Sequence, residues 1–168
     1  MIGRSFFALT LLLLCLGGHE AAASTEIAVN ANRSNDVNIP SYLPGINMVN
    51  ADEVLTAIMI GNILLIDART PSNYLMGTIP TAQSCPVPFG APTLHSAEIK
   101  KVQQKMAGCS AIAQLHPAKA PPIIVFCNGS HCWRSAKAVL ALKRMGFERV
   151  QWFRDGISLW RQQQRPMM

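Results

Sequence analysis

Two apolar runs of strand length restrict the fold of this sequence more than any other feature: residues 63–67 (ILLID) and 123–126 (IIVF). A strand with apolar side chains on both faces must be covered on both faces, which is typical of a parallel sheet between layers of helices. Residues 149–153 (RVQWF) are predicted to form a third, short strand. Because stretches with helical periodicity separate these runs, the sequence predicts an α/β fold with a mainly parallel central sheet flanked by helices.

The predicted helices have recognisable ends. Asn50 can cap a first helix, Glu53 completes a capping box, and Gly61 ends the helix. Ser96 is expected to cap a later helix. Gly146 directly follows the helical pattern 135–145, at a position where a left-handed backbone conformation is favoured. The helical patterns cover residues 50–61, 72–76, 96–108, 135–145 and 155–164.

The N-terminal residues are predicted to be a secretory signal peptide. Arg4 supplies a positive charge, and small residues follow the apolar run 6–16, which is too short to span a bilayer of ~30 Å. The alternatives are an uncleaved anchor or a lipoprotein signal that uses Cys15. We therefore expect a periplasmic or secreted protein that does not span a membrane after cleavage, with a signal peptide (1–23), an extended segment (24–45) and one domain (46–168).

Charge and cysteine content limit the possible partners. The net charge of +6 suits small anions, but no block of lysine and arginine indicates nucleic-acid binding. Export implies an oxidising compartment in which disulfides persist. The cysteines that remain after cleavage are Cys85, Cys109, Cys127 and Cys132, and the sequence cannot choose among their pairings. A disulfide between Cys85 and Cys109 and two free thiols are both compatible with their positions.

Several motifs, in this order and spacing, resemble the rhodanese-like family over roughly residues 47–166. LLIDARTPSNYLMGTIPTA resembles the family's strand that ends in Asp-x-Arg and its following Gly-His-Ile-Pro segment, with Thr78 at the histidine position. IIVFC resembles the strand before the active-site cysteine, and DGISLW resembles the Gly-Gly-x-x-x-Trp ending. The resemblance implies a rhodanese-like three-layer fold and a sulfurtransferase that needs no metal or organic cofactor.

The loop after the second strand departs from the usual family pattern. Six residues separate Cys127 from Arg134, two more than is common, and the insertion contains Cys132 and Trp133. CNGSHCW resembles an exported bacterial subgroup with a CxxxxCW active-site loop. The resemblance therefore implies the family fold, whereas the activity depends on what this longer loop does.

The resemblance makes Cys127 the expected nucleophile and carrier of a persulfide. A helix start or a nearby cation favours the thiolate, so Arg134 is a candidate catalytic cation. Inward-pointing amides of the loop could form a nest for a small sulfur anion such as thiosulfate. The acceptor would be a thiol or a protein. The candidate substrate-binding residues are Asn128, Gly129, Ser130, His131, Trp133 and Arg69, and Arg69 has the alternative of an ion pair with Asp67.

The role of Cys132 stays open at this point. It can be a catalytic resolving thiol that closes a disulfide with Cys127, half of a static disulfide, or a residue that only fills the helix start. The alternatives to a sulfurtransferase are a thiol–disulfide or persulfide relay and a non-catalytic binding module. A metal site on Cys127, His131 and Cys132 is disfavoured because closed zinc sites have four ligands. A phosphatase is disfavoured because a phosphatase loop has five residues between its cysteine and its arginine, whereas six separate Cys127 from Arg134 here.

Overall fold

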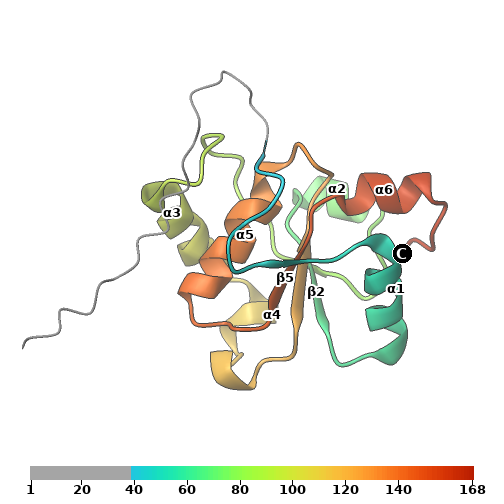
Figure 1. Cartoon of the computed structure of the whole chain (residues 1–168), viewed down its shortest axis with the longest axis horizontal. Coiled ribbons are helices and arrows are strands. Elements are labelled where there is room, and N and C mark those ends of the chain that lie inside the picture. The colour runs from blue at the N-terminus through green and yellow to red at the C-terminus, as the bar shows by residue number, and fades with distance from the viewer. Residues whose placement is uncertain (1–38) are drawn as a thin grey trace, which may run out of the picture. The chain divides into compact units, whose positions relative to one another are not determined.

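The computed structural model describes residues 39–168. The predicted signal peptide and residues 24–38 of the predicted extended segment lie outside the described residues. At the centre is a sheet of five strands, all parallel, in the order β1-β5-β4-β2-β3 (Figure 1). The strands are β1 (Asn47–Met48), β2 (Leu64–Asp67), β3 (Gln83–Ser84), β4 (Ile123–Phe126) and β5 (Val150–Phe153).

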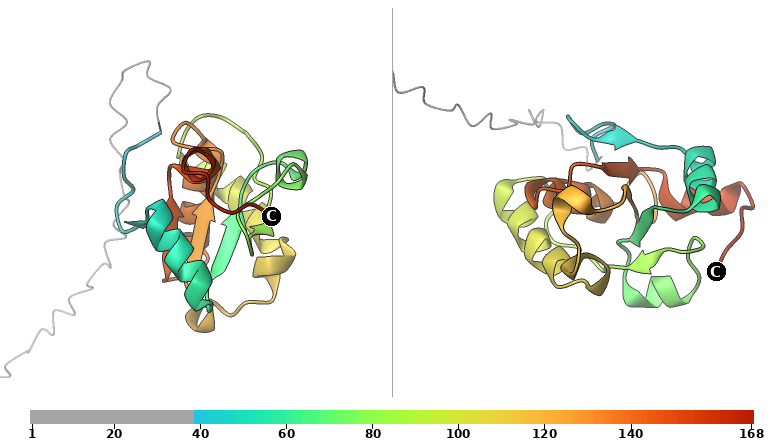
Figure 2. Two further views of the ribbon diagram at one scale, coloured as in Figure 1. Left: turned by 90° about the vertical axis from the view of Figure 1, so that its right-hand side faces the viewer. Right: turned by 90° about the horizontal axis from the view of Figure 1, so that it is seen from below.

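Helices cover both faces of the sheet, which confirms the predicted three-layer α/β arrangement (Figure 2). One face packs against α3, α4 and α5, and the other against α1 and α6. None of the helices within residues 39–168 is long and apolar enough to cross a membrane. The helices are α1 (Ala51–Ile60), α2 (Pro71–Leu75), α3 (Ser96–Ala107), α4 (Ser110–Ala113), α5 (Trp133–Arg144) and α6 (Gly156–Gln162), with a 3₁₀ turn at Pro117–Lys119.

Strand β4 is buried on both faces, as its uninterrupted apolar sequence predicts. Ile123 and Val125 belong to the core cluster beneath α3 and α5, whereas Ile124 and Phe126 belong to the cluster beneath α1 and α6. Burial of each such side chain stabilises the fold by about 1.5–3 kcal/mol. The strand therefore contributes to both core clusters, and Cys127, the residue after its carboxyl end, is fully buried.

The first helix begins as the sequence predicts, and two other helices do not. The side chain of Asn50 accepts hydrogen bonds from the amides of Asp52 and Glu53, and the Glu53 carboxylate accepts from the Asn50 amide at 2.7 Å. In α3 the cap is His95, not Ser96, which is the first helical residue. Helix α5 begins at Trp133, two residues before the expected start. Two-residue strands such as β1 and β3 are too short to carry an alternating pattern and were not predicted.

Both ends of the described chain pack on the rest of the structure. Ile39 and Leu43, from the segment predicted to be extended, are buried in the core beneath α3 and α5. At the other end, the amide of Thr78 donates to the carbonyl of Met168 at 2.8 Å, and the amide of Met168 donates back at 2.9 Å. The last residues therefore lie along the loop that follows α2.

A buried ion pair joins β2 to this same loop. Nη2 of Arg69 lies 2.6 Å from Oδ2 of Asp67, and both side chains are at least 98% buried. Nη2 also donates to the carbonyl of Gly77 at 2.8 Å, and the Thr78 hydroxyl donates to Asp67 at 2.7 Å. The Asp67 carboxylate thus has hydrogen-bond donors that compensate for its burial.

We expect Arg69→Met to destabilise the fold strongly, because it leaves the Asp67 carboxylate buried without its charged partner. The expected loss is about 3–5 kcal/mol in the free energy of unfolding. The measurement is urea unfolding under non-reducing conditions. Lys101→Met is the control: this lysine is 70% exposed in its pair with Glu98, and its loss should cost less than about 1 kcal/mol. Equal losses for the two variants would contradict the assignment.

Candidate active site

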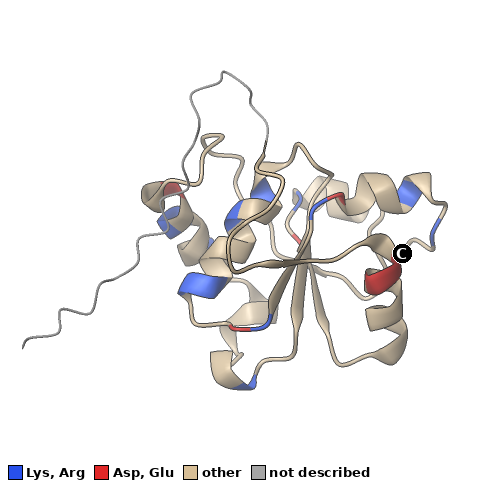
Figure 3. Cartoon of the chain, viewed as in Figure 1, with Lys and Arg blue, Asp and Glu red and all other residues tan. Residues whose placement is uncertain are grey.

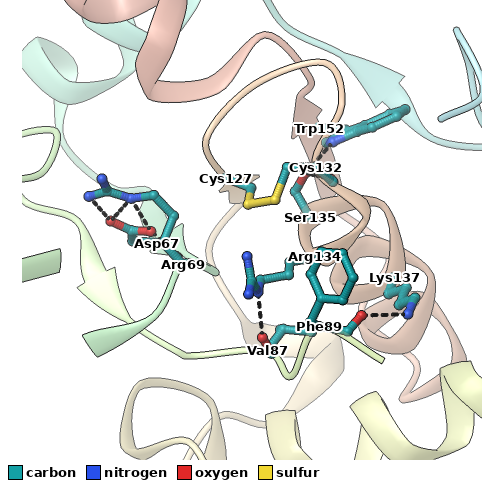
Figure 4. Close-up of a disulfide and its surroundings, with 10 residues drawn as sticks. All are labelled: Asp67, Arg69, Val87, Phe89, Cys127, Cys132, Arg134, Ser135, Lys137 and Trp152. Atoms are coloured by element: carbon teal, nitrogen blue, oxygen red, sulfur yellow. Dashed lines mark hydrogen bonds and ion pairs between the residues drawn. A yellow bond between two sulfur atoms is a disulfide. The ribbon is translucent and has the colours of Figure 1, made fainter. Parts of the chain in front are cut away.

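A disulfide closes the loop between β4 and α5. Cys127 directly follows β4, and Cys132 is the N-cap residue of α5. Their Cα atoms lie 6.1 Å apart, and the sulfur atoms are bonded (Figure 4). The amide of Cys132 donates to the carbonyl of Gly129 at 3.0 Å, which curls the loop back on itself. The sequence left this pairing open.

The first turn of α6 fixes the early part of the loop. The amide of Ile157 donates to the carbonyl of Cys127 at 3.0 Å, and the amide of Ser158 donates to Asn128 at 2.9 Å. This approach requires a glycine at position 156, where φ is +56° and a Cβ atom would lie 2.3 Å from the Cys127 carbonyl oxygen. The glycine of the DGISLW motif therefore lets α6 approach the backbone of the cysteine loop.

Four consecutive backbone amides of the loop are free hydrogen-bond donors in the described part of the chain. Within residues 39–168, the amides of Asn128, Gly129, Ser130 and His131 donate to no other protein group. These four amides come just before the start of α5, a helix of 12 residues whose N-terminus carries partial positive charge. Free amides next to a helix N-terminus form a favourable environment for a thiolate or a small anion.

A pocket of about 470 Å³ opens beside the loop. Six residues selected from the sequence line it: Asn128, Gly129, Ser130, His131, Cys132 and Arg134. Phe89, Asp155, Ser158, Leu159 and Gln162 complete the walls and were not selected. The α6 residues could have been found, because DGISLW follows β5 and the carboxyl ends of neighbouring parallel strands meet at one edge. Phe89 lies in a loop rich in proline and glycine that carries no such signal.

The two candidate cations are held by other protein groups. Nε of Arg134 donates to the carbonyl of Val87 at 3.0 Å, and its guanidinium lies 5.3 Å from the centre of the Phe89 ring (Figure 4). Arg134 lines the pocket, and its hydrogen bond to Val87 and its contact with Phe89 support the pocket wall. For Arg69 the structure shows the ion-pair alternative, because the side chain is committed to Asp67 and does not line the pocket. Its candidacy for substrate binding gains no support from this geometry.

Trp133 is also outside the pocket. Its ring packs against the core cluster beneath α3 and α5. Its indole nitrogen is buried and has no hydrogen-bond partner within residues 39–168. Trp133 is thus placed as a packing residue at the start of α5. Trp152 and Trp160 are fully buried.

A second buried cation anchors the rim of the pocket. Lys137 of α5 donates from Nζ to the carbonyls of Phe89 and Ala91 and lies 3.3 Å from the Glu98 carboxylate. Hydrogen bonding from Lys101, followed by Lys137, holds the pKa of Glu98 below its ordinary value despite partial desolvation. This clamp connects α3 and α5 to the loop that carries Phe89.

The second disulfide secures the beginning of that loop. Cys85 and Cys109, whose Cα atoms lie 5.6 Å apart, are bonded, which is one of the two alternatives that the sequence left open. The amide of Cys85 donates to the carbonyl of Asp67 at 3.0 Å. The rim is thus linked covalently to the start of α4 and by hydrogen bonds to the end of β2.

Neither basic side chains nor potential metal ligands are concentrated at one place in the described chain. In Figure 3, lysine and arginine residues are spread over α3, α5, α6 and the loops instead of gathering on one element. No group of three histidine, cysteine or acidic side chains within residues 39–168 could hold a metal ion. The site is a cysteine pair in an amide-rich loop at the carboxyl end of a parallel strand.

These features define a class of α/β protein with a cysteine loop between strand and helix. Residues 50–163 match the family described as Rhodanese-like domain. The chain therefore belongs to the rhodanese-like family. No curated protein matches the chain.

Solved structures of low identity share the fold. The BH2092 protein of Bacillus halodurans is 23% identical, with a TM-score of 0.55, over 73% of this chain and 76% of that chain. A rhodanese-related protein of Thermoplasma volcanium is 20% identical, with a TM-score of 0.52, over 73% of this chain and 97% of that one. The rhodanese-like domain of an Anabaena protein is 20% identical, with a TM-score of 0.53, over 72% and 77% of the two chains.

We expect Gly156→Ala to destabilise the protein by about 1–3 kcal/mol, because a side chain is strained at positive φ and meets the Cys127 carbonyl. Chemical unfolding measures the change. Gly108→Ala is the matched control, since its nearest contact would be an ordinary 3.7 Å and its φ is negative. The control should shift stability by less than about 1 kcal/mol. A neutral Gly156→Ala variant would show that α6 does not hold the loop.

The Glu98 clamp predicts a dependence of stability on pH. Because the folded pKa of Glu98 is lowered, its contribution is present above the unfolded value of about 4.3 and is lost as pH falls through the folded value. Wild type should therefore melt at a higher temperature than Glu98→Gln at pH 7, and the difference should shrink below about pH 4. Thermal unfolding between pH 3 and 7 tests this, with the exposed Glu148→Gln as control. A constant difference would contradict it.

Proposed function

We propose that the protein is an exported sulfurtransferase in which Cys127 carries sulfane sulfur as a persulfide. The observation that carries the proposal is the set of free amides from Asn128 to His131, beside Cys127 and before the N-terminus of α5. Such donors favour the thiolate over the thiol and can bind the oxygens of a sulfur anion. Export rests on the signal peptide predicted in residues 1–23, and membership of the rhodanese-like family supports the type of reaction.

The reaction consists of two displacements at sulfur. The Cys127 thiolate attacks the outer sulfur of thiosulfate, the new S–S bond forms as the old one breaks, and sulfite leaves with the electron pair. A thiolate or cyanide then attacks the outer sulfur of the persulfide and releases the Cys127 thiolate. The first step needs a free Cys127, so the Cys127–Cys132 disulfide must first be reduced by an external thiol.

A second candidate function is a thiol–disulfide or persulfide relay to a partner protein. The observation that favours it is the disulfide itself, since a sulfurtransferase needs only one of the two cysteines. In a relay, the Cys132 thiolate attacks Sγ of Cys127, the Cys127–Cys132 bond forms, and the group bonded to Cys127 leaves with the electron pair as hydrosulfide or as the partner's thiolate. A non-catalytic binding module would retain the fold without either reaction.

Cysteine variants separate these functions. For a sulfurtransferase, we expect Cys127→Ser to lose thiosulfate:cyanide activity by at least about 100-fold, because the sulfur carrier is absent. Cys132→Ser should be active without a reductant, whereas wild type should need one. After thiosulfate treatment of the reduced protein, intact mass should rise by one sulfur atom in wild type and Cys132→Ser only.

Other results would point elsewhere. Loss of activity in Cys132→Ser, with the persulfide still formed on Cys127, would favour the relay. If neither reduced wild type nor reduced Cys132→Ser gains sulfur, the sulfurtransferase proposal fails, and a thiol–disulfide relay and a binding module are the remaining candidates.

A further inference from the structure

The two cysteines of the loop disulfide differ in their access to the pocket. Cys127 is completely buried, whereas Cys132 retains 9% exposure. Cys132 lines the pocket beside the loop, and Cys127 does not. The difference follows from position: Cys127 directly follows the doubly covered strand β4, and α6 holds its carbonyl, while Cys132 is the N-cap residue of α5 and lines the pocket.

The pocket is large and mixed enough to admit a thiol-bearing molecule. Its volume of about 470 Å³ lies within the range of sites that take small ligands. Phe89 and Leu159 give it apolar surface, and His131 and Asp155 give it polar groups of different kinds. Phe89 is 64% exposed, and its backbone carbonyl is fixed by Lys137, so an aromatic ring stands at the rim.

We propose that this pocket is the site at which an external thiolate attacks Cys132, so that Cys132, and not Cys127, is the sulfur exchanged with the reductant. The proposal rests on the proposed function in so far as it describes how the sulfur-carrying Cys127 is released. The proposal names the atom that is attacked (Sγ of Cys132), the route (the pocket) and the co-reactant (a thiol). Cys132 then reacts with the external reductant, and Cys127 is the buried sulfur carrier.

Atoms and electrons balance in two exchanges. The external thiolate bonds to Sγ of Cys132 as the Cys127–Cys132 bond breaks, and the electron pair leaves on Sγ of Cys127. The free amides from Asn128 to His131 adjoin this leaving thiolate in the chain and can stabilise it. A second thiolate attacks the external sulfur of the mixed disulfide, releases Cys132 and forms an external disulfide. Two thiols are oxidised, and one protein disulfide is reduced.

Trapping the mixed disulfide tests the proposal. The oxidised full-length mature protein is mixed with reduced glutathione, quenched with acid at short times, and alkylated with N-ethylmaleimide. Tryptic cleavage gives a peptide spanning residues 120–134 with both cysteines, and fragment ions between positions 128 and 131 tell them apart. We expect glutathione on Cys132 and maleimide on Cys127, with about tenfold less of the reverse pattern at the earliest times.

Two tryptophan substitutions test the route. Gln162 lines the pocket and is exposed, whereas the adjacent, exposed Gln163 does not line it. We expect Gln162→Trp to slow formation of the adduct at least about threefold by filling the pocket, and Gln163→Trp to change it less than about twofold. Both variants change exposed positions, so native folding can be confirmed by their unfolding midpoints before the rates are compared.

Each outcome supports or overturns a stated part of the inference. Glutathione mainly on Cys127, or no adduct while a phosphine reduces the same disulfide, overturns the proposal, and equal rates for both tryptophan variants overturn the route. If glutathione appears on Cys132 but thiosulfate never adds sulfur to Cys127, the sulfurtransferase fails and this inference stands. If sulfur adds to Cys127 while glutathione attaches there too, only this inference fails.

Discussion

The burial of β4 on both faces is the constraint from which the rest of the site follows. Its four side chains alternate between two core clusters, so helices must cover both sides of the sheet. Cys127 directly follows this strand, so it also lies between the two covering layers and has no exposed surface. The same enclosure brings the first turn of α6 against the loop, since β5 lies beside β4 and delivers α6 to the same edge.

Most of the framework could be predicted because its signals are local. The capping box at Asn50 and Glu53 and the apolar strands β2 and β4 each follow from residue type and spacing. The walls of the pocket depend instead on contacts between distant segments. Phe89 reaches the site because Lys137 and Arg134 bind backbone carbonyls of its loop, 46 to 48 residues away in the chain. No pattern within the loop encodes that contact.

The side chain of Arg134 supports the rim of the pocket. With Cys132 as the N-cap, Arg134 falls in the first turn of α5, and its guanidinium turns toward Val87 and Phe89 (Figure 4). Backbone amides are then the donors closest to Cys127 in the chain, and Arg134 acts by supporting the rim. Sequence reasoning could name the arginine but not its direction, because that direction depends on a carbonyl supplied by another loop.

The contact between α6 and the cysteine loop divides that loop into two unequal halves. The backbone at Cys127 and Asn128 is fixed by the amides of Ile157 and Ser158, whereas Ser130 and His131 have no comparable anchor within the described chain. The first half is therefore held from outside by α6, whereas the second half is held only within the loop, by the hydrogen bond between Cys132 and Gly129 and by the disulfide. A protein engineer who wished to reshape the site would change the residues between Gly129 and Cys132, because α6 determines the geometry before them.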